Sequence, residues 1–550
     1  MRVGRHKYIF VIGGVMSGVG KGIATSSIGA ILQGKGWNVN PIKVDPYLNV
    51  DAGTMNPTEH GEVFVLDSGM ECDQDMGNYE RFMDLKLRSE DYITSGMVYR
   101  YVIEKERALG YKGRCVEAIP HITGDIIRRI KRAASLNKSD ISIIEIGGTV
   151  GDYQNILFIE AARVMKLESP KDVMFLLVSY LPIPSKIGEM KTKPTQNAVH
   201  TLNSYGVQPD VIIARSETPL DEKRKEKLAT SCNVKIENII SAPDIENIYE
   251  VPLNFERDKL GETILKTFGL KSHAKKGWLA KWKGLVSRRK NLKKKVKIAI
   301  IGKYFDTGDF VLSDSYISVI EAIKYSAYAL GAKPQIAWLN SKDFEKDPKT
   351  VRVLKNYDGV IVPGGFGATG VPGKILAIRY ARENKIPYFG LCYGMQLAVI
   401  EFARNVAGLK RADTTEIDPK TPNPVIDFMP DQKKKVADGN YGGSMRLGAY
   451  PALLKKGTVA GSAYGEDRIS ERHRHRYEIN PKYIKKLTDS GLIFSGISPD
   501  GKLMEIAELP KEKHPFFLGT QFHPEFQARP FKPHPLFTKF LEATLSKKGR

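Results

Sequence analysis

A cysteine between two glycines is the residue of this chain best suited to nucleophilic chemistry. Cys392 lies in Gly390-Leu-Cys392-Tyr-Gly394, after an apolar run typical of a strand and before a helical stretch. Glycines two residues before and two after a nucleophile permit the sharp turn that exposes it. A helix N-terminus also lowers the pKa of a thiol. The pattern therefore predicts a reactive thiolate, although a lone cysteine is more often a small buried apolar side chain.

The general base that such a thiol needs is predicted in Gln521-Phe-His523-Pro-Glu525. Residues two apart in extended backbone point the same way, so Glu525 can orient the ring of His523. Residues 363–367, Pro-Gly-Gly-Phe-Gly, follow another predicted strand and offer backbone N–H groups for an oxyanion hole. Together these residues predict attack of a thiolate on an amide or ester.

A glycine-rich loop near the N-terminus predicts a second chemistry, the binding of phosphate. Residues 13–22, Gly-Gly-Val-Met-Ser-Gly-Val-Gly-Lys-Gly, follow an apolar run and open a helical stretch, and Lys21 can reach phosphate oxygens. The usual GxxxxGK[ST] pattern is not matched, because Gly22 stands where Ser or Thr would hold magnesium. We therefore expect Mg²⁺ to be held by carboxylates elsewhere. The candidates are Asp73, Asp75 and Glu145.

Parallel sheets are expected to position both motifs. Short apolar runs alternate with helical stretches, which predicts an α/β fold of two domains, each a mostly parallel sheet flanked by helices. Ligands of such sheets bind at the carboxyl ends of the strands. The predicted helix after the glycine loop covers 22–33. The predicted strands cover 8–12, 39–44, 141–146, 173–179, 211–214, 296–301, 359–362, 388–391 and 516–522.

A basic segment marks the boundary between the two halves. The chain has 550 residues and a net charge of +22. More than half of that excess lies in Lys271–Lys297, which holds twelve Lys or Arg and no acidic residue. Trp278, Leu279, Trp282, Leu285 and Val286 fall there at helical spacing. We predict domains over 1–270 and 297–545, joined by a basic linker helix over 271–296 that is solvated rather than bound to nucleic acid or lipid.

The remaining composition excludes several classes of protein. Four cysteines without paired spacing exclude a disulfide scaffold and a CxxC-type zinc site as organising principles. His473 and His475 lack the cysteine or acidic pair that would complete a zinc site, so packing or solvated roles are favoured. No apolar run reaches the roughly 18 residues of a membrane helix. We expect a cytoplasmic enzyme without a membrane or nucleic-acid partner.

The motifs together resemble a known family. Residues 363–367, 390–396 and 521–526 are similar to the signatures of class I glutamine amidotransferase domains. The N-terminal half resembles the synthetase domain of CTP synthases, and the resemblance extends to Glu471–Glu478. The segments of the N-terminal half that carry it are 13–22, 43–47, 51–55, 60–63, 145–152 and 191–196. The resemblance implies that ATP phosphorylates O4 of UTP and that ammonia, released from glutamine, displaces the phosphate to give CTP.

The resemblance also implies roles for residues of the N-terminal half. Lys43 would support phosphoryl transfer, and ammonia would enter near His60 and Val63. Mg²⁺ would be held by Asp75 and Glu145. ATP would be bound by Gly18, Val19, Gly20, Lys21, Gly22, Ile23, Asp75, Pro243, Asp244 and Ile245. UTP, and the triphosphate of CTP, would be bound by Ser17, Lys191, Thr192, Lys193, Pro194, Thr195, Gln196 and Lys227.

Further implied roles concern glutamine, regulation and assembly. Cys392, His523 and Glu525 would be catalytic. Glutamine would be positioned by Gly365, Tyr393, Gly394, Met395, Gln396, Glu416 and Arg476. Feedback by CTP would use Asp152, Tyr153 and Gln154, where the family usually has Glu at the third position. GTP is the expected allosteric activator, through Gly442–Arg446, and a homotetramer would complete the UTP pocket between subunits.

Two alternatives remain open from the sequence. One is another P-loop amidoligase with a glutaminase domain, similar to a cobyrinate amidase. The other is a homologue that chiefly forms filaments or binds nucleic acid through its basic linker.

Overall fold

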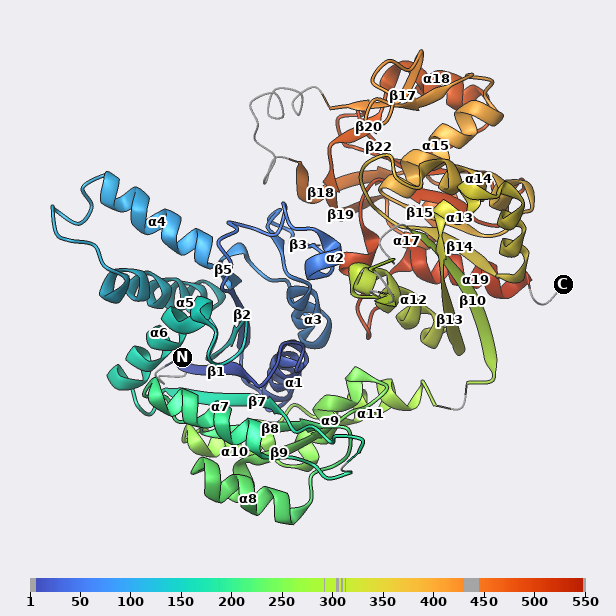
Figure 1. Ribbon diagram of the computed structural model, residues 1–550. Coiled ribbons are helices and arrows are strands. Elements are labelled where there is room, and N and C mark those ends of the chain that lie inside the picture. Colours follow the sequence, from blue (N-terminus) through green and yellow to red (C-terminus); the bar gives the residue numbers. More distant parts are fainter. Residues whose placement is uncertain are drawn as a thin grey trace. The chain divides into compact units, whose positions relative to one another are not determined.

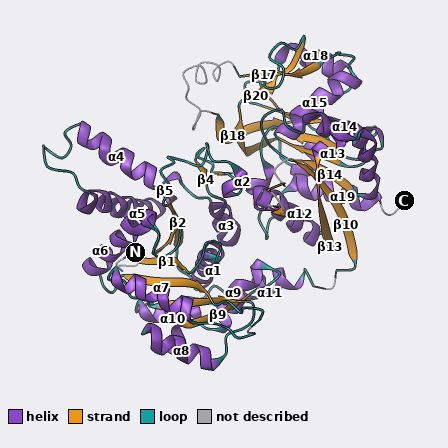
Figure 2. Cartoon of the chain, viewed as in Figure 1, coloured by secondary structure: helices purple, strands orange, loops and turns teal. Residues whose placement is uncertain are grey.

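The chain folds into two compact units. The computed structural model describes residues 6–186, 188–290, 292–302, 306–307, 310–311, 313–429 and 445–547. The first unit holds residues 1–51 and 75–287, and the second holds residues 52–74 and 288–550. In each unit helices flank one large sheet (Figures 1 and 2), which confirms the predicted fold class. Among the described residues, no helix has both the length and the apolar character that crossing a bilayer requires.

The sheet of the first unit has seven parallel strands in the order β5-β2-β6-β1-β7-β8-β9. The five apolar runs predicted as strands form β1, β2, β6, β7 and β8, whereas the short β5 and β9 at the two edges were not predicted. The bounds are β1 Lys7–Gly14, β2 Val39–Asp45, β5 Tyr92–Thr94, β6 Ile141–Ile146, β7 Val173–Tyr180, β8 Val211–Ser216 and β9 Ile239–Pro243.

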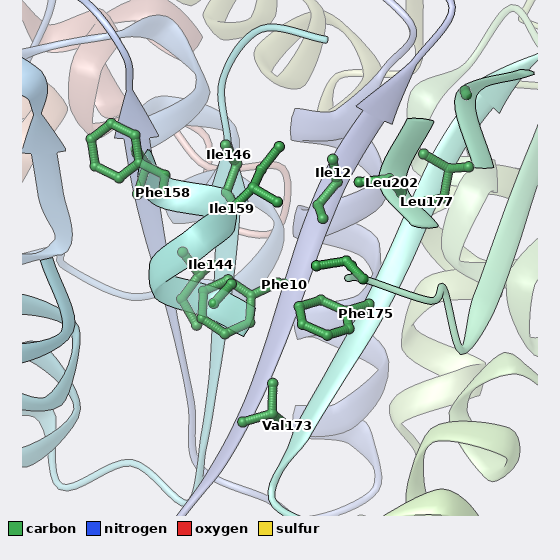
Figure 3. Packing of buried hydrophobic residues seen from close by; sticks show 14 of the residues in the cluster. Phe10, Ile12, Ile144, Ile146, Phe158, Ile159, Val173, Phe175, Leu177 and Leu202 are labelled. Carbon is green, nitrogen blue, oxygen red and sulfur yellow. The ribbon is translucent and has the colours of Figure 1, made fainter. Parts of the chain in front are cut away.

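The core of this unit follows from alternation along β1. Phe10 and Ile12 point to one face, where they meet Phe158, Ile159 and Leu202 (Figure 3). Ile9 and Val11 are buried as well, on the opposite face, which successive side chains of a strand must reach. The helices are α1 Lys21–Gly34, α3 Gln74–Met83, α4 Ser95–Arg107, α5 Thr123–Asn137, α6 Ile156–Glu168, α7 Lys193–Ser204, α8 Glu222–Cys232, α9 Val251–Arg257, α10 Leu260–Thr267 and α11 Trp278–Ser287.

The sheet of the second unit has nine strands in the order β13-β10-β14-β15-β23-β22-β21-β18-β19. The first five run parallel, and the rest continue the sheet with antiparallel pairs, an extension that the sequence did not indicate. The bounds are β10 Lys294–Gly302, β13 Ala332–Asn340, β14 Gly359–Val362, β15 Tyr388–Leu391, β18 Arg446–Leu454, β19 Arg468–His475, β21 Ile493–Ile497, β22 Met504–Glu508 and β23 Phe517–Thr520.

Smaller elements complete the second unit. The minor sheets pair β3 Phe64–Val65 with β4 Glu71–Cys72, β11 Asp306–Thr307 with β12 Phe310–Val311, and β16 Ala412–Thr414 with β17 Asn423–Phe428 and β20 Tyr477–Ile479. The helices are α2 Pro57–His60, α12 Ile317–Ala329, α13 Ser341–Lys346, α14 Val371–Glu383, α15 Tyr393–Asn405, α17 Val459–Tyr464, α18 Pro481–Asp489 and α19 Pro535–Lys547.

Candidate active sites

The turn between β15 and α15 holds Cys392 in a strained conformation. Its φ of +50° and ψ of −99° lie in a region of backbone conformation that residues other than glycine rarely adopt. The backbone N–H of Cys392 donates to the carbonyl of Thr520 at 2.6 Å, which ties the turn to β23. Gly394 is required because a Cβ there would lie 2.1 Å from the carbonyl oxygen of Val362. The fold therefore stores strain at the one residue that the sequence singled out as a nucleophile.

His523 and Glu525 follow β23, the parallel neighbour of β15, so they emerge at the same edge of the sheet as Cys392. His523 Nδ1 lies 2.7 Å from Glu525 Oε1. Burial alone would lower the pKa of His523, but the Glu525 carboxylate and the nearby Cys392 thiolate raise it to about 10. The histidine is therefore poised to hold a proton beside the sulfur. Gly364 leaves room for the ring, since a Cβ there would lie 2.8 Å from His523 Cε1.

Cys392, His523 and Glu525 line a cavity of about 200 Å³ within the second unit. One wall comes from the glycine loop at residues 363–367, with Gly364 and Gly365. Another comes from segment 52–74, with Val63. Arg474 and Arg476 also line it and supply positive charge. The cavity thus brings the predicted nucleophile, base and oxyanion-hole loop together.

Segment 52–74 is fixed to the second unit by ion pairs from β19. Buried Arg472 contacts Asp67 at 2.5 Å and donates to the carbonyl of Val65 at 3.1 Å. Arg474 lies 2.8 Å from Glu71. These charged pairs are largely withdrawn from water, where removal of one partner is costly. His60 belongs to this segment, and its Nδ1 lies 3.4 Å from Asp73 Oδ2.

Two of the predicted glutamine-binding residues contact the glycine loop at 363–367. Tyr393 is buried, and its hydroxyl donates to the carbonyl of Gly367 at 2.9 Å, while Glu416 accepts from the N–H of Gly367 at 2.6 Å. Gly394 and Met395 are buried in the first turn of α15. The hydroxyl of Tyr393 thus helps to hold residues 363–367 in place.

His473 and His475 are buried side by side on β19. His473 Nδ1 lies 3.0 Å from His475 Nε2, and Arg446 donates to Glu505 and Glu478 in the same cluster. Burial, reinforced by the Arg446 charge, holds the pKa of both histidines well below the usual range. They are neutral packing residues in the described structure.

The glycine loop of the first unit turns from β1 into α1 as predicted. Gly20, with φ of +87°, precedes the helix, and a Cβ there would lie 2.5 Å from Arg215 Nη1. Lys21 is buried, and its Nζ donates to the carbonyl of Gly148 at 2.8 Å. Burial lowers the pKa of Lys21, although the Glu145 carboxylate opposes that shift. The lysine lies in a loop built to receive an anion.

Lys43 joins the two carboxylates predicted to hold Mg²⁺. Its Nζ lies 2.5 Å from Asp75 Oδ2 and 2.9 Å from Glu145 Oε1. A Cβ at Gly22 would lie only 1.9 Å from Asp75 Oδ1, which explains why Ser or Thr is absent at this position. Two carboxylates beside a phosphate-binding loop form a donor set that fits Mg²⁺, which keeps several waters and phosphate oxygens as further ligands. Asp73 belongs to the other unit.

A separate cavity of about 160 Å³ lies beside the loop in the first unit. Ile23, Pro243, Asp244 and Ile245 line it, together with Arg215, which forms a short ion pair with Asp244. Its apolar walls and size are suited to a flat heterocycle next to the phosphate loop.

Comparison with known proteins gives a family match in each half of the chain. Residues 7–270 match the family described as CTP synthase N-terminus, and residues 311–543 match glutamine amidotransferase class-I. The CTP synthase of Thermococcus gammatolerans is 51% identical over 544 residues, which cover 98% of this chain and 99% of that protein. The chain belongs to the CTP synthase family.

Other similar proteins include the CTP synthase of Caldanaerobacter subterraneus, which is 49% identical over 98% of this chain and 99% of its own length. The solved glutaminase domain of Trypanosoma brucei CTPS with bound acivicin is 35% identical, with a TM-score of 0.42, and covers 46% of this chain and 94% of that domain. Full-length similarity favours the CTP synthase family over the alternative that resembles a cobyrinate amidase.

Six of the eight predicted UTP residues of this family member, Lys191 to Gln196, lie at the start of α7. Thr195 Oγ1 lies 2.8 Å from Ser179 Oγ, and Gln196 donates to Thr192 at 3.1 Å, so both side chains are fixed. Lys191 reaches Glu189 at 2.6 Å. Pro194 lies in the first turn of α7. The remaining predicted UTP residues are exposed, namely Ser17, Lys193 and Lys227.

The predicted feedback residues form an exposed turn before α6. Asp152 accepts from the backbone N–H of Thr149 at 2.7 Å, which fixes the turn. Tyr153 is 93% exposed and Gln154 is exposed as well. Of the segment predicted for GTP, residues 442–444 lie outside the described residues.

Sequence reasoning missed three side chains at these sites. Arg215, on β8, lines the cavity beside the phosphate loop, and Arg474 lines the cavity of Cys392. Gln521 lies in the motif quoted for His523, yet no role was assigned to it; its Nε2 is 3.7 Å from Cys392 Sγ. No local sequence pattern assigns these three side chains to a site, because their contacts are made only in the folded chain.

Proposed function

We propose that this chain converts UTP to CTP with glutamine as the nitrogen donor and ATP as the activating substrate. CTP synthases are glutamine-dependent ligases, and the family membership of this chain rests on similarity over nearly its whole length. The observation that carries the proposal is the intact Cys392–His523–Glu525 arrangement in a chain that also holds a phosphate loop.

The chemistry proposed for the second unit releases ammonia. The Cys392 thiolate attacks the carboxamide carbon of glutamine, and backbone N–H groups of the glycine loop stabilise the oxyanion. The C–N bond breaks as His523 gives its proton to the departing ammonia. His523 then takes a proton from water, whose oxygen attacks the thioester carbon. The C–S bond breaks, glutamate leaves, and the Cys392 thiolate is restored beside the protonated His523. Glu525 keeps the ring oriented throughout.

The chemistry proposed for the first unit consumes that ammonia. Lys21 and Lys43 neutralise charge on the phosphoryl group that passes from ATP to uracil O4, and ammonia then displaces it. Asp75 and Glu145 would hold Mg²⁺, which supplies charge neutralisation on the phosphates. The cavity of Ile23 and its neighbours would take the base of ATP.

Several finer features belong to the same proposal. They are a synthetase domain over 1–270, a linker over 271–296, a glutaminase domain over 297–545, a homotetramer, feedback by CTP, activation by GTP and a cytoplasmic location. Exposure of the predicted UTP residues Lys193 and Lys227 supports a pocket that a neighbouring subunit completes.

The test is direct. Purified protein with UTP, ATP, Mg²⁺ and glutamine should form CTP, and free ammonia should replace glutamine. If no CTP forms with glutamine and none forms with ammonia, the proposal is refuted. CTP with ammonia alone would limit the failure to the second unit.

A further inference from the structure

Gln521 is a buried amide that contacts the predicted nucleophile. It follows β23 directly, its side chain is 0% exposed, and its backbone N–H donates to the carbonyl of Glu505 at 2.8 Å. Its Nε2 lies 3.7 Å from Cys392 Sγ, a normal separation for a hydrogen bond to sulfur. A buried amide must satisfy both its oxygen and its nitrogen, so its orientation is decided by its neighbours.

Gln396 fixes that orientation. The Nε2 of Gln396 donates to the backbone carbonyl of Tyr477 at 2.9 Å and to Gln521 Oε1 at 3.2 Å. A carbonyl can only accept, so Gln396 must present its nitrogen to this corner. The oxygen of Gln521 therefore faces Gln396, and its NH₂ group faces the sulfur.

The sulfur has a second polar neighbour of opposite character. The carbonyl oxygen of Arg474 lies 3.7 Å from Cys392 Sγ and can only accept a hydrogen bond, so it favours the neutral thiol, which can donate one. The Gln521 NH₂ group can only donate, so it favours the thiolate. The protonated ring of His523 also interacts with the sulfur and favours the thiolate, so Gln521 acts together with His523 and against the Arg474 carbonyl.

We propose that Gln521 is a positioning residue that holds the sulfur of Cys392 and stabilises its thiolate form. The inference deepens the proposed glutaminase function, on which its importance for catalysis rests. The chain of contacts from Tyr477 through Gln396 to Gln521 also ties the sulfur to a strand that follows Arg476, one of the predicted glutamine ligands.

The test is the pH dependence of alkylation of Cys392 by iodoacetamide in the full chain, with Cys392→Ala as the blank for the other cysteines. Gln521→Met keeps the size and removes the donor. Because a hydrogen bond to a charged group is lost, the midpoint of the alkylation profile should rise by about one pH unit. Gln521→Asn withdraws the amide by one methylene and should give a rise in the same direction.

Gln527→Met is the matched control, because Gln527 donates to Glu471 and to the carbonyl of Ser470 rather than to sulfur. Its alkylation midpoint should equal that of the unmodified chain. With glutamine, Gln521→Met should lower kcat about tenfold at neutral pH with a smaller change in KM, while ammonia-dependent CTP formation stays unchanged.

An unchanged midpoint in both Gln521 variants would overturn the inference. The alkylation profile does not depend on CTP formation, so failure of the proposed function would be recognised separately, by a shifted midpoint in a chain that makes no CTP. If Gln521→Met loses ammonia-dependent activity as well, its fold is disturbed. The alkylation midpoint of Gln521→Asn is then the measurement that supports or overturns the inference.

Discussion

Replacement of Gly22 by Ala tests how closely the phosphate loop and the carboxylate site are fitted together. A Cβ at this position would lie 1.9 Å from Asp75 Oδ1 and 2.5 Å from its Cγ. Real Cβ contacts essentially never fall below 3.0 Å, so the carboxylate must withdraw by about 1.1 Å. Asp75 is held by Lys43 at 2.5 Å and by Asn78 at 3.3 Å, and both contacts would be disturbed.

A displacement of about 1 Å in a positioning group can cost on the order of 100-fold in rate. We therefore expect Gly22→Ala to lower kcat/KM for ATP about 100-fold in ammonia-dependent CTP formation, measured by the absorbance change from UTP to CTP. Alkylation of Cys392 should be unchanged, because that site lies in the other unit.

Gly124→Ala is the matched control for this experiment. Gly124 lies in α5, and a Cβ there meets no atom within 4 Å. The substitution should leave activity intact and improve helix propensity by up to about 1 kcal/mol. If Gly22→Ala behaves like this control, with kcat/KM within twofold of the unmodified chain, the assignment of Asp75 to the reacting site is wrong.

Three other outcomes are expected. Cys392→Ala should abolish glutamine-dependent CTP formation and leave the ammonia-dependent reaction, as read by CTP production with each donor; loss of both in a folded variant would contradict the division of labour. The pKa of His523, about 10 in the fold against an ordinary value near 6.5, means that its ion pair stabilises the fold fully below pH 6.5 and loses this effect as pH rises through about 10. The Tm should therefore fall from pH 7 to 10, and Glu525→Gln should flatten that decline. Gln154→Glu should tighten inhibition by CTP several-fold without changing the apparent UTP affinity, because a charged acceptor binds the cytosine amine more strongly; an unchanged inhibition constant would remove Gln154 from the feedback site.

Most of the parallel strands were predicted from their apolar runs, whereas β5, β9 and β13 were not. Strands β14 and β15 have the bounds expected from Gly359–Val362 and Tyr388–Leu391. Strand β19 was missed for a physical reason. Its buried side chains include Glu471, Arg472 and His473, so it carries no apolar signal. Such a strand is stable only with partners such as Asp67, which lies about 400 residues away in the chain.

Local motifs pointed to Cys392 and Lys21 through the glycines around them, and to His523 through its spacing from Glu525. They could not explain Gly22, because the reason is the approach of Asp75 from another helix. Nor could they reveal Gln521, whose role depends on the amide orientation that Gln396 imposes.

The backbone passes from one unit to the other three times, at residues 51/52, 74/75 and 287/288. A gene fragment that begins at residue 288 would therefore encode a glutaminase without residues 52–74, which form part of the wall of the Cys392 cavity. Arg472 would lose Asp67, and Arg474 would lose Glu71. The two halves of the sequence therefore do not coincide with the two folded units. A chimera that carries the glutaminase half of a relative should fold only when residues 52–74 come from the same relative.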